Sequence, residues 1–402
     1  MSELGSPVPV QLYSRFMTEL FDEKDFIGVP STFLSLFGRP ESGSKTTYQP
    51  DKLEIDIDII RANERMATMV PRGTQAKKLG LKEAKKERFT ERNMVFPLGE
   101  EESTITANQL FMRRPGENPY EQKTRLQRMR EQALDYHKEH VRRMARTFNY
   151  LASQAIITGK MPAIIGTTDT GLIYDFKRKA THTWTASVAW TTASTDILGD
   201  MDASCNLIRQ DASVIPDVCF LGSTAMESIL ANAAIIALAD NRRFQQASIV
   251  TDQDCPKKYM FLQDAGWNFR GILKTPQGYS LHLFSSVEGY DNAAGTFTKF
   301  IGDEQCVIGS TEARCDRLFG PPERLPMMGS EVQFFQELFG FSPSAPPMPG
   351  NIKNGSMVIS PEMFFFDARV SEDRKNVVLR TQTAPIFSPI HTDAWVTIDI
   401  TP

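Results

Sequence analysis

The sequence of 402 residues predicts an α+β fold arranged around one very long helix. Three observations lead to this expectation. Apolar residues recur at helical spacing over 118–158, apolar and acidic residues alternate over 53–59, and the chain after residue 195 alternates between helix and strand patterns. A helix of this length and a lone pair of strands cannot bury their apolar faces within one small domain. The pattern therefore predicts a chain that assembles with copies of itself.

The long helix is expected over residues 118–158. Asn118 is its expected N-cap, with Pro119 in the first helical position and Glu121 completing a capping box. Gly159 follows the last periodic residue and is typical of a helix end. At about 1.5 Å per residue the helix would be about 60 Å long. One stripe of apolar or neutral residues runs along it: Leu126, Met129, Ala133, His137, Val141, Met144, Phe148, Leu151 and Ala155.

The other faces of this helix carry mostly basic residues. Five arginines are its candidate contact residues: Arg128, Arg130, Arg142, Arg143 and Arg146. The simplest interpretation is a solvated face. The alternative is contact with an acidic partner surface or with packaged phosphate.

Residues 46–98 are expected to form a long β-hairpin that lies on another part of the assembly. Its first strand has an apolar face, Leu53, Ile55, Ile57 and Ile59, and an acidic face, Glu54, Asp56 and Asp58. The chain then becomes strongly basic. Eight basic residues stand against three glutamates: Arg72, Lys77, Lys78, Lys82, Lys85, Lys86, Arg88 and Arg92. Because Phe89 is the only aromatic residue there, contact between subunits is favoured over contact with nucleic acid.

The remaining elements are expected in chain order. Residues 1–32 form an arm that is partly helical and not packed as a domain, 161–178 a β-hairpin or β-turn region, 195–209 a helix, 215–221 a strand and 224–240 a helix capped by Thr224 and Glu227. A β-meander over 269–301 and strands at 306–309, 377–383 and 395–400 follow. Residues 331–362 are rich in proline and glycine and indicate an inserted loop.

Composition excludes several classes of protein. The net charge of −4 gives no general argument for nucleic-acid binding. Five cysteines without a Cys-x-x-Cys pair predict free buried thiols and a reducing compartment. The sequence has neither the layout of a signal peptide nor an apolar run long enough to span a membrane. These features predict a soluble intracellular product without contact to a membrane.

The sequence gives little indication of catalysis, and no catalytic residue, cofactor or metal is expected. The pair His137 and His140 is a candidate for metal binding, but an ordinary helix surface is the preferred interpretation because no third ligand is evident. The carboxylates of Glu54, Asp56 and Asp58 are likewise candidate ligands for a cation, but the polar face of a strand is the preferred interpretation. Ser223 and Gly309-Ser310-Thr311 resemble nucleophile turns only loosely, and structural turns explain them better.

The order and spacing of several segments resemble those of a known family. They are Phe33–Phe37, Met66–Ala76 with Val70-Pro71, Leu110–Pro115, Arg128–Glu131, Ile308–Arg314 and Gln382–Pro385. Together they are similar to the lambda-type major capsid proteins of tailed bacteriophages, which have the Hong Kong 97-like fold. The resemblance covers most of residues 30–400, and the region 330–375 departs from it.

The resemblance implies a domain organisation. Residues 1–40 would be the N-terminal arm, 41–104 the extended loop, 105–190 with 363–402 the peripheral domain around the spine helix at 118–158, and 191–330 the axial domain. The acidic set and the basic residues from Lys77 to Arg92 would then lie at subunit contacts.

The resemblance also implies a function. The protein would form hexamers and pentamers of an icosahedral head around double-stranded DNA, assembled in the host bacterial cytoplasm with a separate scaffolding protein, a portal and, in some phages, a decoration protein. No covalent Lys–Asn link between subunits is expected. The alternatives are an encapsulin-like compartment, a nucleic-acid-binding protein that uses residues 72–92, and an enzyme with its site in the α/β part.

Overall fold

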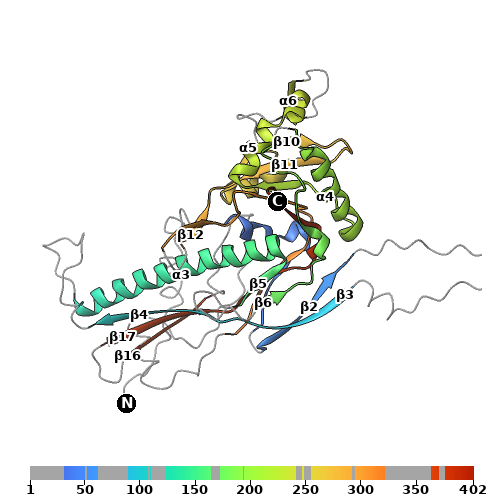
Figure 1. Cartoon of the computed structure of the whole chain (residues 1–402). Helices are drawn as coiled ribbons and strands as arrows, with labels where there is room; N and C mark the ends of the chain where they lie inside the picture. Colours follow the sequence, from blue (N-terminus) through green and yellow to red (C-terminus); the bar gives the residue numbers. More distant parts are fainter. Residues whose placement is uncertain are drawn as a thin grey trace, which may run out of the picture.

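The computed structural model describes residues 31–49, 52–61, 89–106, 109, 124–163, 173–192, 194–240, 247–248, 255–291, 295–321, 364–370 and 376–402. The long helix α3 (Arg125–Thr158) crosses the middle of the molecule (Figure 1). A seven-stranded sheet with its helices lies over one end of α3, and a three-stranded sheet runs beneath it. A two-stranded hairpin projects beside the end that carries the larger sheet. The predicted α+β class and the central long helix are confirmed.

Helix α3 begins later than predicted. Thr124 is its N-cap: the Thr124 hydroxyl accepts the Gln127 amide, and the Gln127 side chain accepts the Thr124 amide. The predicted cap, Asn118, lies outside the described residues. The predicted end is confirmed, because Gly159 has a φ of 67° in the left-handed region. The 34 residues of α3 give a length of about 51 Å.

The predicted apolar stripe of α3 is buried from Ala133 to Ala155, while Met129 is half-buried. Its members in the inner half are fully or almost fully buried: Val141, Met144, Phe148, Leu151 and Ala155. Ala145, Ala152 and Ile156, which were not part of the stripe, are also buried. The Phe148 ring packs against the rings of Phe319, Phe364 and Phe387 at centroid distances of 5.6–5.9 Å. This aromatic cluster joins α3 to segments that are far away in the sequence.

The three-stranded sheet lies along the outer half of α3. Its strands are antiparallel, in the order β16 (Phe365–Val370), β17 (Asn376–Thr383) and β4 (Gly99–Thr106). The acidic run at the start of β4 is neutralised inside this layer. Arg380 of β17 forms ion pairs with Glu100 at 2.6 Å and Glu102 at 3.1 Å, and Arg143 of α3 lies 3.7 Å from Glu101.

The seven-stranded sheet forms the second hydrophobic core. Its strand order is β7 (Thr183–Thr185), β19 (Trp395–Asp399), β14 (Gln305–Gly309), β8 (Val218–Leu221), β11 (Ser280–Ser285), β10 (Asn268–Lys274) and β9 (Ala247–Ser248). The helices of this part are α4 (Ile197–Ala212), α5 (Ser223–Ala231), α6 (Ala233–Asp240) and α7 (Met260–Asp264). Strands β7 and β19 lie in the ranges expected for the peripheral domain, whereas the other five strands lie in the range expected for the axial domain. The seven-stranded sheet therefore contains strands from both expected domains.

The helix predicted over 224–240 is two helices. They are separated at Asn232, whose side-chain oxygen accepts the Ala234 amide at 3.1 Å and so supports the start of α6. The cap predicted at Thr224 is also wrong, because α5 begins one residue earlier and Gly222 is its N-cap. The first amides of a helix have no acceptor within that helix, so the Ala234 amide needs a capping acceptor such as the Asn232 side chain. Periodicity alone does not reveal this break between α5 and α6.

The segment after residue 31 is part of the core. The short 3-10 helix η2 (Phe33–Leu36) is buried, and the Phe33 ring lies 5.1 Å from the Trp267 ring. Asn149 of α3 accepts the Leu34 amide at 3.0 Å. Residues 31–37 are therefore packed in the core, although the resemblance assigned residues 1–40 to an N-terminal arm. Residues 1–30 lie outside the described part of the chain.

A third, mixed sheet joins this segment to the C-terminal part. Strand β1 (Thr46–Tyr48) is parallel to β15 (Cys315–Phe319), which is antiparallel to β18 (Pro385–Pro389). β18 lies between the two strands predicted at 377–383 and 395–400, and no strand was predicted there. Pro385 and Pro389 are its two ends, where a missing amide hydrogen is tolerated.

The remaining strands form three hairpins. They are β2 (Glu54–Ile60) with β3 (Phe89–Val95), β5 (Lys160–Pro162) with β6 (Ile173–Asp175), and β12 (Gly289–Asp291) with β13 (Phe297–Lys299). Short 3-10 helices are η3 (Pro40–Ser42), η4 (Ala180–His182), η5 (Lys257–Tyr259) and η7 (Thr392–Ala394). The hairpin of β2 and β3, called the long hairpin below, confirms the pairing predicted for 46–98.

Candidate assembly surface

The long hairpin has one face in the core and one face in solvent. Ile55, Ile57 and Ile59 are buried, with exposed fractions of 8% or less, while the side chains of Glu54, Asp56 and Asp58 are exposed. Asn93 of β3 donates to the Asp56 carboxylate at 3.0 Å. The predicted alternation is confirmed for residues 54–59, but Leu53, predicted on the apolar face, precedes β2 and is exposed. The apolar face packs in the core of the same chain and not, as expected, on another part of the assembly. The outer face remains acidic.

The basic partner set is only partly placed. Lys77, Lys78, Lys82, Lys85, Lys86 and Arg88 lie outside the described residues. Arg92 belongs to β3, where its backbone pairs with Ile57. Contact between the basic segment from Lys77 to Arg92 and an acidic face therefore stays a prediction.

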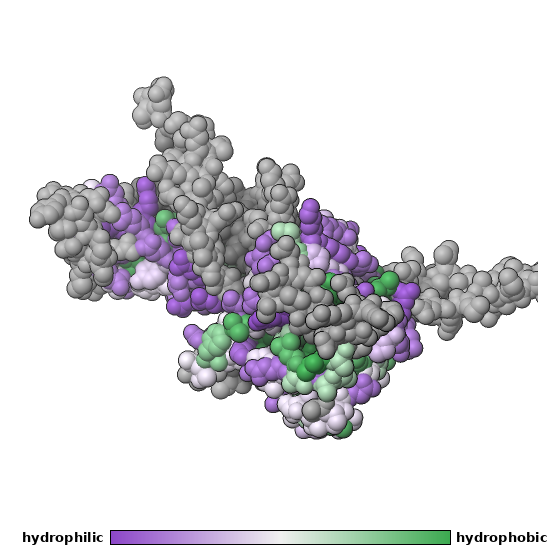
Figure 2. All heavy atoms as spheres, turned by 90° about the horizontal axis from the view of Figure 1, so that it is seen from above, coloured by the Kyte–Doolittle hydropathy of each residue, from purple (hydrophilic) through white to green (hydrophobic). Residues whose placement is uncertain are grey.

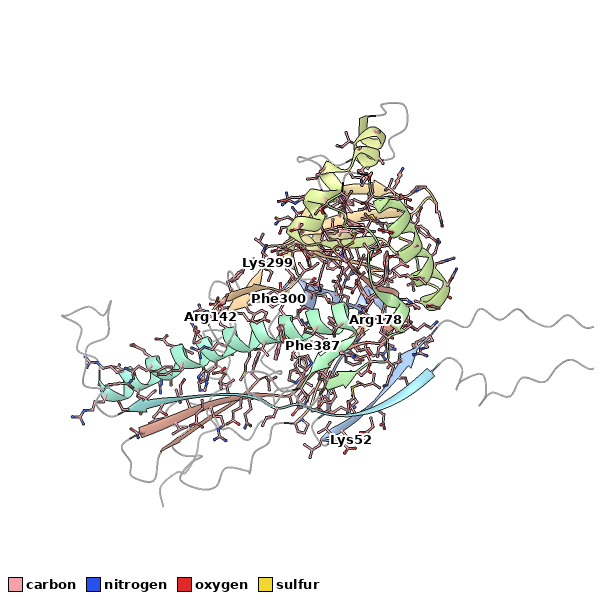
Figure 3. All side chains as sticks on the ribbon, viewed as in Figure 1. Lys52, Arg142, Arg178, Lys299, Phe300 and Phe387 are labelled. Carbon is pink, nitrogen blue, oxygen red and sulfur yellow. The ribbon has the colours of Figure 1, made fainter. Side chains whose placement is uncertain are left out.

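Exposed apolar side chains gather at the lower end of the long hairpin. They are Leu53, Val95, Leu98 and Ile173, with exposed fractions of 65%, 48%, 37% and 53%. Backbone and side-chain contacts hold three of their segments together: the Phe96 amide donates to Leu53 O at 2.9 Å, and the Tyr174 hydroxyl donates to Val95 O at 2.6 Å. Lys52 marks this end in Figure 3. Apolar side chains exposed together are typical of a contact surface, and periodicity did not predict this one.

The basic face of α3 is exposed but partly neutralised within the chain. Arg130, Arg143 and Arg146 are exposed, and Arg128 and Arg142 are half-buried. Glu139 lies 3.2 Å from Arg143 and 3.9 Å from Arg142. Viewed from above, the residues along the outer part of the molecule are mainly hydrophilic (Figure 2). Arg142 and Arg143 are thus partly neutralised within the chain. Whether this face of α3 contacts a partner stays a prediction.

His137 and His140 are not on an ordinary helix surface. Both are buried between α3 and the three-stranded sheet. The Thr381 hydroxyl lies 2.9 Å from His137 Nδ1 and 3.0 Å from His140 Nδ1, and the Ser103 hydroxyl lies 2.7 Å from His140 Nε2. Burial lowers the pKa of His137 to about 3 and that of His140 to about 4. Both imidazoles are therefore neutral and structural near pH 7.

Neither the histidines nor the carboxylates form a metal site in the described part of the chain. No group of three or more histidine, cysteine, aspartate or glutamate side chains there could hold a metal ion. The acidic residues of β2 share one strand face. No helix among the described residues has the length and apolarity needed to cross a membrane.

The two weak nucleophile candidates have structural partners. The Ser223 hydroxyl donates to Asp303 at 2.6 Å, and the buried Thr311 hydroxyl donates to Asp217 at 2.6 Å. In the described residues, no imidazole contacts either hydroxyl. All five cysteines are free, and the sulfur atoms of buried Cys219 and Cys306 are 3.5 Å apart. The prediction of free thiols is confirmed.

Arg178 is an important residue that the sequence did not indicate. Its guanidinium donates to the carbonyl oxygens of Ile156, at 2.7 Å, and Ile157, and to the Thr183 hydroxyl at 2.8 Å. The last carbonyls of a helix have no partner within the helix, so Arg178 satisfies and neutralises the end of α3. Figure 3 shows Arg178 at this end. Burial lowers its pKa to about 10, which leaves it charged at pH 7.

Replacing Arg178 by alanine is expected to lower the free energy of unfolding by about 2–3 kcal/mol, since two buried charge-assisted hydrogen bonds are lost. Arg178→Lys should lose less because the charge remains near the helix end. The measurement is chemical denaturation of the subunit. Arg209→Ala, at an exposed position of α4, is the control and should change stability little. Equal stability of the Arg178→Ala variant and the wild type would contradict the capping role.

Comparison with known proteins agrees with this architecture. The sequence matches the family model described as phage major capsid protein E over residues 24–400. The fold is similar to the crystal structure of a putative capsid protein of a prophage of E. coli CFT073, with a TM-score of 0.53 and 14% identity over 96% of this chain and 98% of that chain.

Two further structures are more distantly similar. The mature capsid of bacteriophage PhiM1 has a TM-score of 0.43 and 7% identity over 89% of this chain and 85% of that chain. The SrpI encapsulin complex from Synechococcus elongatus PCC 7942 has a TM-score of 0.36 and 8% identity over 88% of this chain and 84% of that chain. No curated protein sequence matches the chain.

The match spans nearly the whole chain, including the segments on which the resemblance was based. The α+β arrangement of a long helix, a projecting hairpin and two sheets is the Hong Kong 97-like capsid fold. Both the resemblance and the fold class are confirmed. The chain belongs to the phage major capsid protein E family and is a structural protein of a phage capsid.

Proposed function

We propose that copies of this chain form hexamers and pentamers that tile the icosahedral head of a tailed phage around packaged double-stranded DNA. Assembly takes place in the cytoplasm of the host bacterium. The family match supports a shell protein, and the exposed outer face of the long hairpin is the observation that carries the mode of assembly. This role needs no catalytic residue, cofactor or metal.

The proposed division of the chain follows the family resemblance with one change. The arm is limited to residues 1–30, because residues 31–37 are buried in the core. The extended loop is 41–104, the peripheral domain is 105–190 with 363–402, and the axial domain is 191–330. Residues 331–362 are an inserted loop. The long hairpin is the described root of the extended loop.

The outer face of the long hairpin fits contact with a second subunit. Three exposed carboxylates lie on β2, and the exposed apolar residues Leu53 and Val95 lie directly before β2 and at the end of β3. An apolar centre with charged surroundings is typical of an interface. The neighbouring copy is the proposed partner of this surface.

The same chain carries a charge-complementary segment. Residues from Lys77 to Arg92 are strongly basic and follow the acidic strand. If the basic segment of one copy contacts the acidic face of the next, each copy gives and receives one contact. Head-to-tail contacts of this kind close into rings, and the charges set the register of neighbours more than the strength of binding. Rings of five and six subunits use the same contact.

Other partners follow from the same proposal. A separate scaffolding protein, a portal and, in some phages, a decoration protein complete the head. Packaged DNA is near the inner surface without sequence-specific contacts. Arg130 and Arg146 on the exposed face of α3 would provide local positive charge if that face is turned inward.

Reversing the charges of Lys77, Lys78, Lys82 and Lys85 to glutamate is expected to reduce the yield of closed particles by about tenfold or more, because like charges then meet across the interface. The subunit should still fold. The measurement is electron microscopy and sedimentation of the purified variant, with circular dichroism to monitor folding.

A matched control reverses four exposed basic residues elsewhere: Lys45, Arg209, Lys257 and Lys274. This control keeps the change in net charge and should assemble better than the first variant. Equal yields for wild type and the loop variant would contradict the proposed contact. A persistent wild-type monomer with salt-sensitive affinity for DNA would instead support a nucleic-acid-binding protein.

A further inference from the structure

We propose that Arg61 is a positioning residue that fixes the direction in which the extended loop leaves the body of the protein. It does so through an anchor formed by Arg61, Lys177, Lys179 and Asp393. The importance of this direction rests on the proposed role of the loop in assembly. Arg61 directly follows β2, and it is the last described residue before the segment 62–88.

Three contacts hold the chain at this point. The Ile60 amide donates to Ile390 O at 3.0 Å. The Arg61 guanidinium donates through Nη2 to Lys177 O at 2.8 Å, and Arg61 Nε lies 3.5 Å from the Asp393 carboxylate. Backbone and side chain of consecutive residues are therefore tied to two different segments of the body. Such a pair of attachments fixes an orientation, whereas a single contact would leave the strand free to pivot.

The acidic member of the anchor is buried. The Asp393 side chain is 1% exposed, and its Oδ1 accepts the Lys179 amide at 3.0 Å. A carboxylate removed from water needs both hydrogen bonds and a nearby positive charge. The Arg61 side chain is 33% exposed and reaches this carboxylate from the hairpin side. Asp393 therefore holds the guanidinium more firmly than a solvent-exposed carboxylate would.

The acceptor of the Arg61 hydrogen bond has an unusual backbone conformation. Lys177 has a φ of 56°, and among the described residues only Ser213 is another non-glycine residue with positive φ. The Lys177 amide donates to Asp175 at 2.7 Å, which holds this turn in place. Residues that bear side chains adopt this region at a cost, and such strain persists where surrounding contacts enforce it. The turn presents the Lys177 carbonyl to Arg61.

The anchor also connects the hairpin with the rest of the fold. Arg178, between Lys177 and Lys179, caps the end of α3. The Lys179 ammonium pairs with Asp211 of α4. Figures 1 and 3 show the upper end of the long hairpin beside the end of α3 and below α4. A change in the direction of the loop would therefore disturb contacts that connect to α3 and α4. We infer that these contacts with the body of the protein, and not the pairing of β2 with β3, fix the direction of the loop.

The test compares Arg61→Gln, Asp393→Asn and Arg61→Lys with the wild type. Hydrogen exchange of the Ile60 and Lys179 amides is measured on the folded subunit, and thermal unfolding and particle yield are measured in parallel. In Arg61→Gln we expect exchange of both amides to rise by about tenfold and particle yield to fall by a similar factor, while the melting temperature of the subunit changes by only a few degrees. Arg61→Lys, which keeps the charge, should restore part of the yield.

Lys258→Gln is the matched control. It removes another cation that pairs with a mostly buried carboxylate, Asp217, at 3.1 Å in the part of the fold that carries the seven-stranded sheet. Exchange at Ile60 and Lys179 should be unchanged in this variant. If Arg61→Gln does not fold, Asp393→Asn decides the question, since asparagine keeps the volume and can still accept the Lys179 amide.

Several outcomes would overturn the inference. Exchange of the Ile60 amide at the wild-type rate in both Arg61→Gln and Asp393→Asn would show that no anchor exists. Fast exchange with normal particle yield would refute its role in assembly, and a loss of yield in proportion to lost thermal stability would reduce Arg61 to a stabilising residue. If the wild type itself forms no particles, the proposed function fails, and the exchange rates alone then decide whether the anchor exists.

Discussion

Ala133→Pro is expected to abolish particle formation. Ala133 lies in α3, more than two turns after its start, and is fully buried. Proline there removes the amide that bonds to the carbonyl of residue 129 and places its ring against that carbonyl, which costs about 3 kcal/mol or more. The kink would also displace the outer half of α3 from the three-stranded sheet. Circular dichroism, thermal unfolding and electron microscopy of the same preparation measure the effect.

Arg125→Pro is the matched control for this substitution. Residue 125 is the first residue of α3, where the amide needs no partner within the helix and the φ of proline is suitable. This variant should keep most of its stability and should form particles. Normal particles from Ala133→Pro would contradict the view of α3 as the rigid strut of the subunit.

Acidification is expected to destabilise the subunit strongly, through His137 and His140. Their pKa values in the folded protein, about 3 and about 4, lie below the ordinary value of 6.5 because burial disfavours the charged imidazole. Unfolded chains therefore take up these protons first as the pH falls. The stabilising contribution is complete above pH 6.5 and decreases as the pH falls toward about 4, with each unit of pKa difference worth about 1.4 kcal/mol. For two histidines the loss is several kcal/mol.

Neighbouring charges influence the two histidines unequally. Arg143 lowers and Glu139 raises the pKa of His140, while His140 itself lowers the pKa of His137. The hydroxyl groups of Thr381 and Ser103, which lie at hydrogen-bond distance from the two rings, are uncharged.

The double variant His137→Gln with His140→Gln tests this explanation. Glutamine can keep hydrogen bonds to Thr381 and Ser103 but does not titrate. The free energy of unfolding, measured by denaturant at a series of pH values, should depend less on pH between 6.5 and about 4 in the variant than in the wild type. Identical slopes for both proteins would show that other groups cause the acid sensitivity.

Much of the fold was predictable because it depends on local patterns. The stripe from Ala133 to Ala155 defined α3, and alternation defined β2 and its two faces. The start of α3 was misplaced because two capping patterns occur within seven residues. The pattern at Asn118 was chosen, whereas Thr124 with Gln127 forms the capping box in the structure. Equivalent local signals cannot be ranked without knowing what surrounds them.

Errors arose where distant segments meet. Phe33 was placed in an arm because nothing nearby indicates its contacts with Trp267 and Phe220, which are more than 180 residues away. β19 likewise joins the seven-stranded sheet through β14 and β7, a pairing that periodicity cannot predict. Long-range pairing depends on the packing of the whole chain, and local propensity does not encode it.

In the candidate assembly surface too, features that depend on local pattern were predicted and features that depend on distant segments were not. The acidic residues of β2 were found by alternation, because exposure on a strand follows from position. The apolar group around Leu53 combines residues from three separate segments, so no single window of sequence contains it. Arg178 acts on carbonyl oxygens 21 and 22 residues before it, which places it beyond any capping pattern. The helical spacing placed His137 correctly on the stripe of α3, but it did not predict that His137 is buried against Thr381.

Electron cryomicroscopy of the purified wild-type protein tests both the assembly and the contact made by the long hairpin. We expect closed icosahedral shells in which the face of β2 that carries Glu54, Asp56 and Asp58 lies against a neighbouring subunit. Monomers that persist at high protein concentration would contradict the assembly function. Shells in which this face of the long hairpin is turned to solvent would contradict the proposed contact while leaving the capsid fold intact.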